Sequence, residues 1–157
     1  MFFGQARLIR GGFQLRNFGE FVFGVGFTAG RFNRIDVFED AELTIGNNFR
    51  MTDFNHIGCA SSVVIGDDVL VASGVYITDH DHKISTSFLP PAQTGLTIEP
   101  VKIGSRVWIG EKATILKGVD IGNDCVIAAN AVVTKSVPPG CVVAGNPARI
   151  LRQRYST

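Results

Sequence analysis

Residues 103–138 divide into six groups of six: IGSRVW, IGEKAT, ILKGVD, IGNDCV, IAANAV and VTKSVP. Each group opens with an aliphatic residue, and the second position is usually glycine or alanine. The fifth position always holds a small or β-branched residue: Val107, Ala113, Val119, Cys125, Ala131 and Val137. A fixed short period of this kind is typical of a solenoid, in which each repeat is one structural unit.

A period of six matches neither the helical period of 3.6 nor the two-residue alternation of an ordinary strand. It matches a short strand followed by a corner. The aliphatic residue then points inward, the small fifth residue fits a tight interior, and glycine or polar residues take the corners. Six consecutive groups in one phase favour this arrangement over a β-sandwich with chance spacing.

The overall composition is that of a single packed domain of 157 residues. The net charge of +1 gives no reason to expect a nucleic-acid partner. The segment Met1–Arg7 has no long apolar run, so we expect neither a signal peptide nor a transmembrane helix.

The chain has three cysteines, Cys59, Cys125 and Cys141. An odd number, with Cys125 in the small fifth position of its group, favours reduced thiols in a reducing compartment over a disulfide framework. None of them has a nearby base in the sequence, so we do not expect a catalytic cysteine.

The repeat phase predicts coils over residues 35–78 and 101–138. Residues 1–34 are rich in phenylalanine and glycine and only loosely periodic, so we expect irregular strands or turns that cap the first coil. Contact of this segment with a membrane surface or a partner is the alternative. Between Ile57 and Ile65 the phase slips, which predicts a two-residue insertion at a corner.

The period vanishes between residues 79 and 100, where Pro90 and Pro91 also occur. We therefore expect a loop that leaves the coils, and long loops in compact folds are usually functional. Residues 139–157 form the tail. Its segment after Pro147 could be a short helix or extended.

The cluster Asp79-His80-Asp81-His82 stands where the regular repeat ends. A histidine can accept a proton near neutral pH, and transfer of an acetyl group to a hydroxyl needs such a base. Asp79 and Asp81 could orient an imidazole or bind a sugar hydroxyl, while solvated loop charge is the simpler role for each alone.

The run from Val107 through Pro138-Pro139-Gly140 to Ala144-Gly-Asn-Pro-Ala-Arg149 resembles the hexapeptide-repeat acyltransferases. The similarity spans residues 28–152 and is greatest to the maltose and galactoside O-acetyltransferases and their relatives in bacterial polysaccharide synthesis. It implies an all-β, left-handed parallel β-helix. It also implies a cytoplasmic homotrimer with active sites between neighbouring subunits.

The resemblance further implies an acetyl-CoA-dependent O-acetyltransferase acting on a sugar or polysaccharide precursor. Transfer would be direct, in a ternary complex, with a histidine as general base and no metal; N-acetylation of an amino sugar is the near variant. Aligned with the family, His82 matches the catalytic histidine, and His80 is the competing choice because one residue of realignment is easily tolerated.

The same resemblance implies a set of cofactor contacts. The cations Lys135 and Arg149 would pair with the phosphates of the cofactor, and Arg152 is a weaker candidate. Trp108 would line the acceptor or pantetheine channel, or else pack between subunits. The candidates for the cofactor site are Trp108, Gly110, Ala128, Ala129, Thr134, Lys135 and Arg149.

Two departures from the family pattern affect the site. The common Gly-Ala-Gly of a late coil is Ala128-Ala129-Asn130 here. Phe54 stands where the sugar acetyltransferases have an asparagine that holds the acceptor, so only its neighbours Asp53 and Asn55 are acceptor candidates.

The sequence leaves two hypotheses of other classes. A zinc hydratase on the same fold would need three imidazoles, and His56, His80 and His82 supply that number. The His-x-His spacing does not match that family, however. A non-catalytic β-helix scaffold is the other alternative, since a fold does not fix a function.

Overall fold

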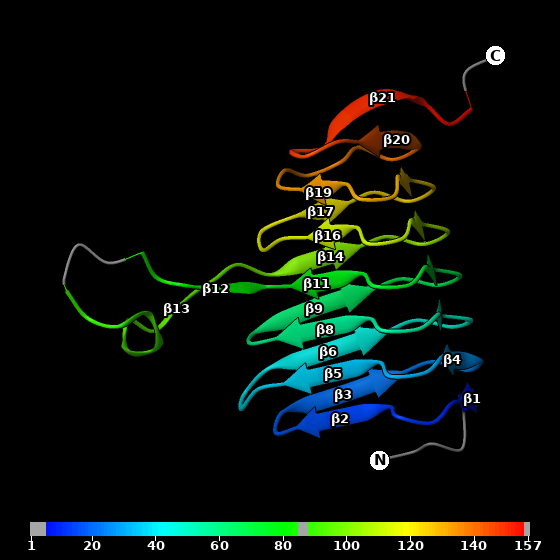
Figure 1. The fold of residues 1–157 in the computed structure, drawn as a ribbon. Coiled ribbons are helices and arrows are strands. Elements are labelled where there is room, and N and C mark those ends of the chain that lie inside the picture. The colour runs from blue at the N-terminus through cyan, green and yellow to red at the C-terminus, as the bar shows by residue number, and fades with distance from the viewer. Residues whose placement is uncertain (1–5, 85–87, 156–157) are drawn as a thin grey trace.

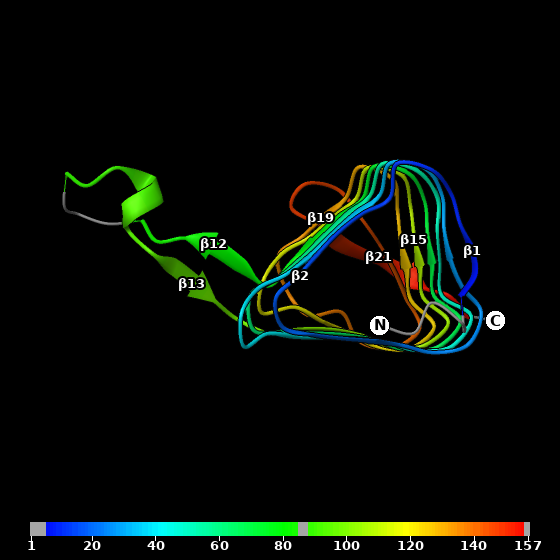
Figure 2. The ribbon, with the colours of Figure 1, turned by 90° about the horizontal axis from the view of Figure 1, so that it is seen from below.

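The computed structural model describes residues 6–84 and 88–155. These residues form a left-handed parallel β-helix whose coils stack along one axis (Figure 1), with three flat faces and three corners in cross-section (Figure 2). This confirms the fold expected from the hexad repeat and the family resemblance.

Each face is one sheet, here called A, B and C. Sheet A consists of β1 (Ala6–Ile9), β4 (Phe27–Ala29), β7 (Arg50–Met51), β10 (Leu70–Val71), β15 (Trp108–Ile109), β18 (Val126–Ile127), β20 (Cys141–Ala144) and β21 (Arg149–Gln153). Sheet B consists of β2 (Gln14–Asn17), β5 (Arg34–Val37), β8 (His56–Cys59), β11 (Tyr76–Thr78), β16 (Thr114–Ile115) and β19 (Val132–Val133). Sheet C consists of β3 (Glu20–Phe23), β6 (Glu42–Ile45), β9 (Ser62–Ile65), β14 (Val101–Ile103) and β17 (Asp120–Ile121).

The core is built from columns of identical or similar side chains. On sheet B the strands pair in register, so one column consists of Ile35, Ile57, Ile77, Ile115 and Val133. Every member of that column is at most 2% exposed. The aliphatic first position of each hexad therefore points inward, as the repeat predicted. Each coil is thin, so only its inward-pointing side chains are buried.

The corners explain the glycine of the second hexad position. A Cβ on Gly110 would lie 2.6 Å from Ala129 N, in the backbone of the next coil. Elsewhere at the corners ordinary residues adopt positive φ, among them Phe54 (61°) and Lys112 (57°).

Residues before 35 are more regular than the sequence predicted. Strands β1 to β3 pair in parallel with β4 to β6 and thus form a coil of the helix itself. Several of their phenylalanines pack together, as in the Phe23–Phe27 contact with ring centroids 4.9 Å apart.

The segment between Thr78 and Val101 leaves the helix at one corner as an arm (Figure 2). Strands β12 (His80–His82) and β13 (Leu96–Ile98) pair antiparallel, and the 3-10 helix η2 (Pro91–Gln93) lies beyond them. The predicted protruding loop is therefore a hairpin, which satisfies its backbone groups outside the coils.

The C-terminal segment after Pro147 is extended, not helical. Strand β21 folds back antiparallel on β20. It thereby pairs with the last open edge of sheet A, which would otherwise expose unpaired backbone groups.

Within residues 6–84 and 88–155, no helix has the length and apolar character needed to span a membrane.

Candidate active site

A cavity of about 300 Å³ lies on the outer face of sheet B, beside the corner from which the arm leaves. Arg16, Arg34, Asp36 and His56 line one side of it, and His80 comes from the first strand of the arm. Strands of three successive coils supply the side chains, because outward residues on neighbouring strands stack directly above one another.

His80 is held in this cavity by its neighbour. Its Nδ1 lies 2.9 Å from Oδ1 of Asp79, and its side chain is 14% exposed. Because the carboxylate can only accept, Nδ1 carries the proton and Nε2 is the nitrogen with a free lone pair. A neutral imidazole oriented in this way is the arrangement required of a general base.

Asp79 is fully buried and plugs a corner of the preceding coil. Its two oxygens accept hydrogen bonds from the backbone N–H groups of Ala60, Ser61 and Ser62, at 2.7–2.9 Å. This corner lies between Ile57 and Ile65, where the sequence predicted two extra residues. The wider corner supplies the donors that stabilise a buried negative charge.

Gly58 forms the floor of the cavity beneath the imidazole. A Cβ at this position would lie 3.1 Å from Cε1 of His80 and 3.9 Å from Nε2 of His56. The absence of a side chain here therefore creates the space in which His80 lies.

Asp36 gathers cations on the opposite side. Its side chain is 7% exposed, and its oxygens accept hydrogen bonds from Nε of Arg16 at 2.8 Å and Nε2 of His56 at 2.9 Å. Nε of Arg34 lies 2.6 Å from the same carboxylate, a close contact of opposite charges without the angle of a hydrogen bond. Outward carboxylates are buried only when they are compensated in this way.

His82 lies further out on the arm and is exposed. It lines a second cavity, of about 440 Å³, together with His80, Tyr76 and Phe38. Its neighbour Asp81 is 3.1 Å from Nζ of Lys117, which also reaches Glu99 at 3.5 Å. These ion pairs raise the pKa of Lys117, chiefly through the hydrogen bond to Asp81, and they tie both sides of the arm to the coils.

Comparison with known proteins gives consistent matches over this architecture. The family model "Bacterial transferase hexapeptide (six repeats)" matches residues 100–135, and "Hexapeptide repeat of succinyl-transferase" matches residues 57–79. The putative lipopolysaccharide biosynthesis O-acetyl transferase WbbJ of Escherichia coli K12 is 40% identical, over 98% of this chain and 82% of its own length.

The chain belongs to the hexapeptide-repeat acyltransferase family.

Further members of the family are similar to this chain in sequence and in structure. Galactoside O-acetyltransferase of Escherichia coli K12 is 37% identical, over 72% of this chain but only 55% of its own length. A solved structure of galactoside acetyltransferase in complex with coenzyme A has a TM-score of 0.66 at 28% identity, covering 92% of this chain and 66% of that chain. The hexapeptide-repeat acetyltransferase VCA0836 from Vibrio cholerae has a TM-score of 0.64 at 28% identity, covering 93% and 73%.

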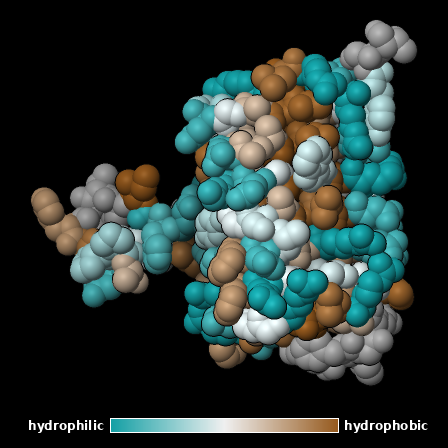
Figure 3. Space-filling model, turned by 45° about the vertical axis from the view of Figure 1, so that its right-hand side comes forward, coloured by the Kyte–Doolittle hydropathy of each residue, from teal (hydrophilic) through white to brown (hydrophobic). Residues whose placement is uncertain are grey.

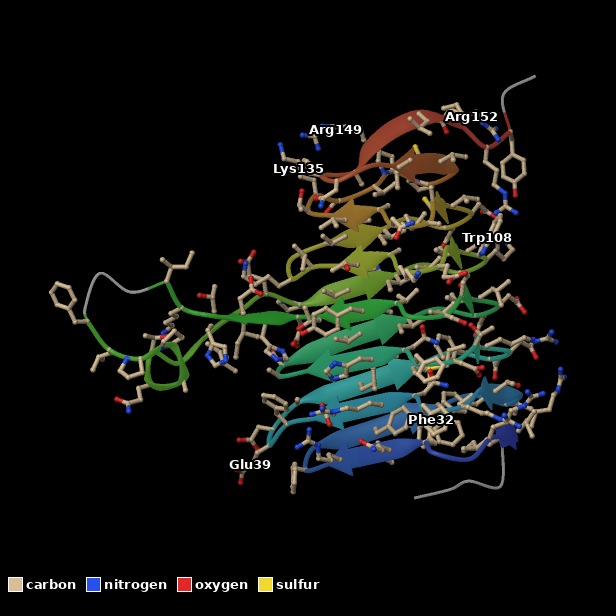
Figure 4. The ribbon with its side chains drawn as sticks, viewed as in Figure 1. Phe32, Glu39, Trp108, Lys135, Arg149 and Arg152 are labelled. Carbon is tan, nitrogen blue, oxygen red and sulfur yellow. The ribbon has the colours of Figure 1, made fainter. Side chains whose placement is uncertain are left out.

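The residues that the family resemblance assigns to the cofactor lie on later coils of this acyltransferase. Lys135 and Arg149 are exposed and lie on the arm's side of the helix, whereas Trp108 and Arg152 lie on the other side (Figure 4). Trp108 is 51% exposed. Ala129 and Thr134 are also exposed, Ala128 is half-buried and Gly110 is buried against the backbone of the next coil.

The acceptor candidates Asp53 and Asn55 are not among the residues that line the cavity. Oδ1 of Asp53 accepts a hydrogen bond from Arg31 N at 2.7 Å. Asn55 is 2% exposed, and its Oδ1 accepts one from Val75 N at 2.8 Å. Both side chains bind the backbone of a neighbouring coil, so they stabilise the stacking of coils and do not face the cavity.

Sequence reasoning missed the contribution of Arg16, Arg34 and Asp36 to the cavity and considered His56 only as a ligand in the zinc hydratase alternative. These residues lie about twenty positions apart in the chain, in the segment whose repeat was too weak to set the register. Because β2, β5 and β8 lie side by side in register, Arg16 is next to Asp36 and Arg34 is next to His56 on neighbouring strands.

The same geometry bears on two alternative chemistries, a cysteine nucleophile and a bound metal ion. Burial, with a contribution from the charge of Asp79, raises the pKa of the Cys59 thiol to about 12, and burial also raises that of Cys125. Neither is a ready nucleophile. Within residues 6–84 and 88–155, no group of three or more His, Cys, Asp or Glu side chains is arranged to hold a metal ion.

Proposed function

We propose that this protein transfers an acetyl group from acetyl-CoA to a hydroxyl of a sugar or polysaccharide precursor. The observation that carries the proposal is the Asp79–His80 pair, with a free Nε2 in a cavity large enough for a sugar ring. The names of the relatives support the substrate class, since they include a lipopolysaccharide O-acetyl transferase and a galactoside O-acetyltransferase.

In the proposed reaction, Nε2 of His80 takes the proton of the acceptor hydroxyl while its oxygen attacks the thioester carbonyl carbon. The new C–O bond forms and the C–S bond breaks. The proton held by His80 then passes to the leaving thiolate. Asp79 stabilises the imidazolium between these two steps and keeps the ring in the reactive tautomer.

His82 is the alternative base, and the family alignment favours it. Its position on the exposed side of the arm would suit a site completed by a neighbouring subunit. Asp79 hydrogen-bonds His80 directly, so the geometry of the single chain favours His80.

We propose that Lys135 and Arg149 hold the phosphates of acetyl-CoA. Both are exposed cations, and no acidic side chain pairs with either of them among the described residues. The cofactor itself is supported by two solved relatives, galactoside acetyltransferase in complex with coenzyme A and VCA0836 complexed with acetyl coenzyme A.

We further propose a cytoplasmic homotrimer. Apolar side chains gather in a band along the axis of the helix (Figure 3), and exposed ones on sheet A include Leu70 at 43% and Trp108 at 51%. A patch of this kind is usually covered by a partner. The three free cysteines and the use of acetyl-CoA support a reducing compartment.

The first test is thermal unfolding with and without coenzyme A. Ligand at one hundred times its Kd should stabilise the protein by about 2.7 kcal/mol. The double variant Lys135→Ala/Arg149→Ala should lose the shift, whereas Lys102→Ala/Arg50→Ala, which removes the same charge elsewhere, should keep it. No shift for the wild type at millimolar coenzyme A would contradict the transferase function and favour a scaffold.

Acceptor screening then separates the two histidines and the two kinds of acceptor. His80→Ala should lower kcat by about 100-fold or more, while His82→Ala should have a smaller effect. The reverse order would assign the base to His82. Transfer only to amino sugars would support N-acetylation, and zinc-dependent hydration of carbon dioxide without transfer would support the hydratase.

A further inference from the structure

The cavity beside His80 carries more positive than negative charge. Two guanidinium groups, of Arg16 and Arg34, face one buried carboxylate, that of Asp36. His56 completes the group through its hydrogen bond to Asp36. One carboxylate can balance only one of the two arginines, so the wall of the cavity keeps an uncompensated positive charge.

The way in which Asp36 binds the arginines leaves their terminal nitrogens available. It contacts Nε of Arg16 and Nε of Arg34. In the described ranges, neither residue has a hydrogen bond or ion pair at its terminal nitrogens. A guanidinium offers five N–H donors in a planar fork, and a planar or tetrahedral oxyanion is the group that uses two of them at once.

The opposite wall of the cavity is apolar. Phe18 and Phe38 line it, and the ring of Phe38 lies 5.0 Å from that of His80. The two phenylalanines continue into an adjoining cavity with Leu96 and Ile98 of the arm, where Glu39 is the one acidic lining residue. A ligand with one anionic group and a less polar ring face would match both walls.

These cations are distinct from those proposed for acetyl-CoA. Strands β2 and β5, which carry Arg16 and Arg34, lie near the N-terminal end of the helix, below the arm in Figure 1. Lys135 and Arg149 lie above the arm, near the C-terminal end (Figure 4). The arm thus separates a cation pair on the acceptor side from one on the donor side.

We propose that the acceptor is anionic, with a carboxylate or a phosphate bound by Arg16 and Arg34 while a nearby hydroxyl faces His80. This proposal rests on the function proposed above and adds a substrate class to it. A neutral sugar would leave the two guanidinium groups without a partner when it displaced their water, which disfavours it relative to an acidic one.

The test is direct binding of three small probes at fixed pH: methyl glucuronide, glucose 6-phosphate and methyl glucoside. The chain has only three histidines, so their imidazole signals in NMR spectra report on the cavity. We expect the acidic probes to shift the signals of His56 and His80 more than that of His82, and the neutral probe to bind at least tenfold more weakly.

Two single variants test the cations. Arg16→Gln and Arg34→Gln should each weaken binding of the acidic probe by about tenfold, the loss expected for one charge-assisted contact. Arg50→Gln, which removes an equal charge from sheet A, should leave it unchanged. Arg16 is the safer variant, because its side chain is 56% exposed and Asp36 keeps both other partners.

The outcomes separate the sources of the anion. Binding of the glucuronide alone indicates an acidic sugar, and binding of the phosphate alone indicates a phosphorylated one. Equal binding of the neutral probe, equal loss in Arg50→Gln, or no binding of either acidic probe would overturn the proposal. The coenzyme A shift, measured on the same samples, tests the transferase function separately, so failure of one leaves the other standing.

Discussion

Asp79 joins the coils to the candidate base. Its carboxylate accepts four hydrogen bonds, three from backbone N–H groups of one corner and one from His80. It therefore orders both the corner and the imidazole. Oδ1 of Asp79 accepts the hydrogen bond from Nδ1 of His80, so this one atom orients the histidine with which the arm begins.

Asp79→Asn tests this double role. One oxygen becomes an NH2 group, which cannot accept, so at least one buried donor loses its partner and stability should fall by roughly 1–3 kcal/mol. Transfer activity should fall as well, since the amide no longer stabilises an imidazolium. Urea unfolding measures the first effect. Asp81→Asn, an exposed aspartate, should cost less than about 1 kcal/mol.

Gly58→Ala tests the floor of the cavity. The new methyl group would lie 3.1 Å from Cε1 of His80, so the ring must shift by a few tenths of an ångström. Because general-base catalysis depends on that position, kcat should fall several-fold or more while the coenzyme A-induced shift in Tm stays the same. Unchanged kcat would show that His80 does not need this position.

The strands of this protein are short, and the corners between them set the spacing of the coils. Gly110 is one of several glycines whose missing Cβ allows the next coil to approach, and the three nearest atoms there are all backbone, at 2.6–2.9 Å. Backbone cannot rotate aside as a side chain can. The stacking distance of the coils therefore depends on these glycines.

Gly110→Ala should accordingly destabilise the protein by about 1–3 kcal/mol through overpacking. Denaturant unfolding measures the change. Gly11→Ala is the matched control, because a Cβ at Gly11 would have no atom within 4 Å, and it should be close to neutral. Equal effects of the two substitutions would contradict the packing explanation.

The whole molecule is a stack that is closed at its C-terminal end by β21. Arg154 donates to the backbone carbonyls of Arg106 and Asp124, and the side chains of Arg106 and Asp124 form two hydrogen bonds of 2.7–2.8 Å. This cluster ties the last residues to two earlier coils. Hydrogen bonding from Arg106 holds the pKa of Asp124 below its ordinary value.

The resulting pH dependence has a definite sign. A carboxyl group with a lowered folded pKa contributes stability that is present above its unfolded pKa, about 3.9, and is lost as pH falls through the folded pKa. Asp124→Asn should therefore lower Tm by a constant small amount above about pH 5, and the difference should vanish at lower pH. In an Arg106→Gln background, which lacks the main cause of the lowered pKa of Asp124, the difference should be much smaller at every pH.

The repeat alone was sufficient to predict the coils after Ile65, the departure of the chain at residue 79 and the extra residues of the corner before Ile65. Each follows from local spacing, because a regular period of six matches a short strand and a corner, and loss of the period marks a departure from the coils. The histidine cluster was found for the same reason: it stands where that spacing stops.

The partners of those histidines depend on stacking between coils. Asp36 meets Arg16 and His56 only because β2, β5 and β8 lie side by side, and Asn55 binds the backbone of the next coil. Such contacts join residues about twenty positions apart through register, and the first coils lack the strict hexads that would set it. The local pattern of the chain therefore specifies the coils and the place where the candidate site lies, whereas the charge of the cavity and the orientation of His80 arise only when the coils stack.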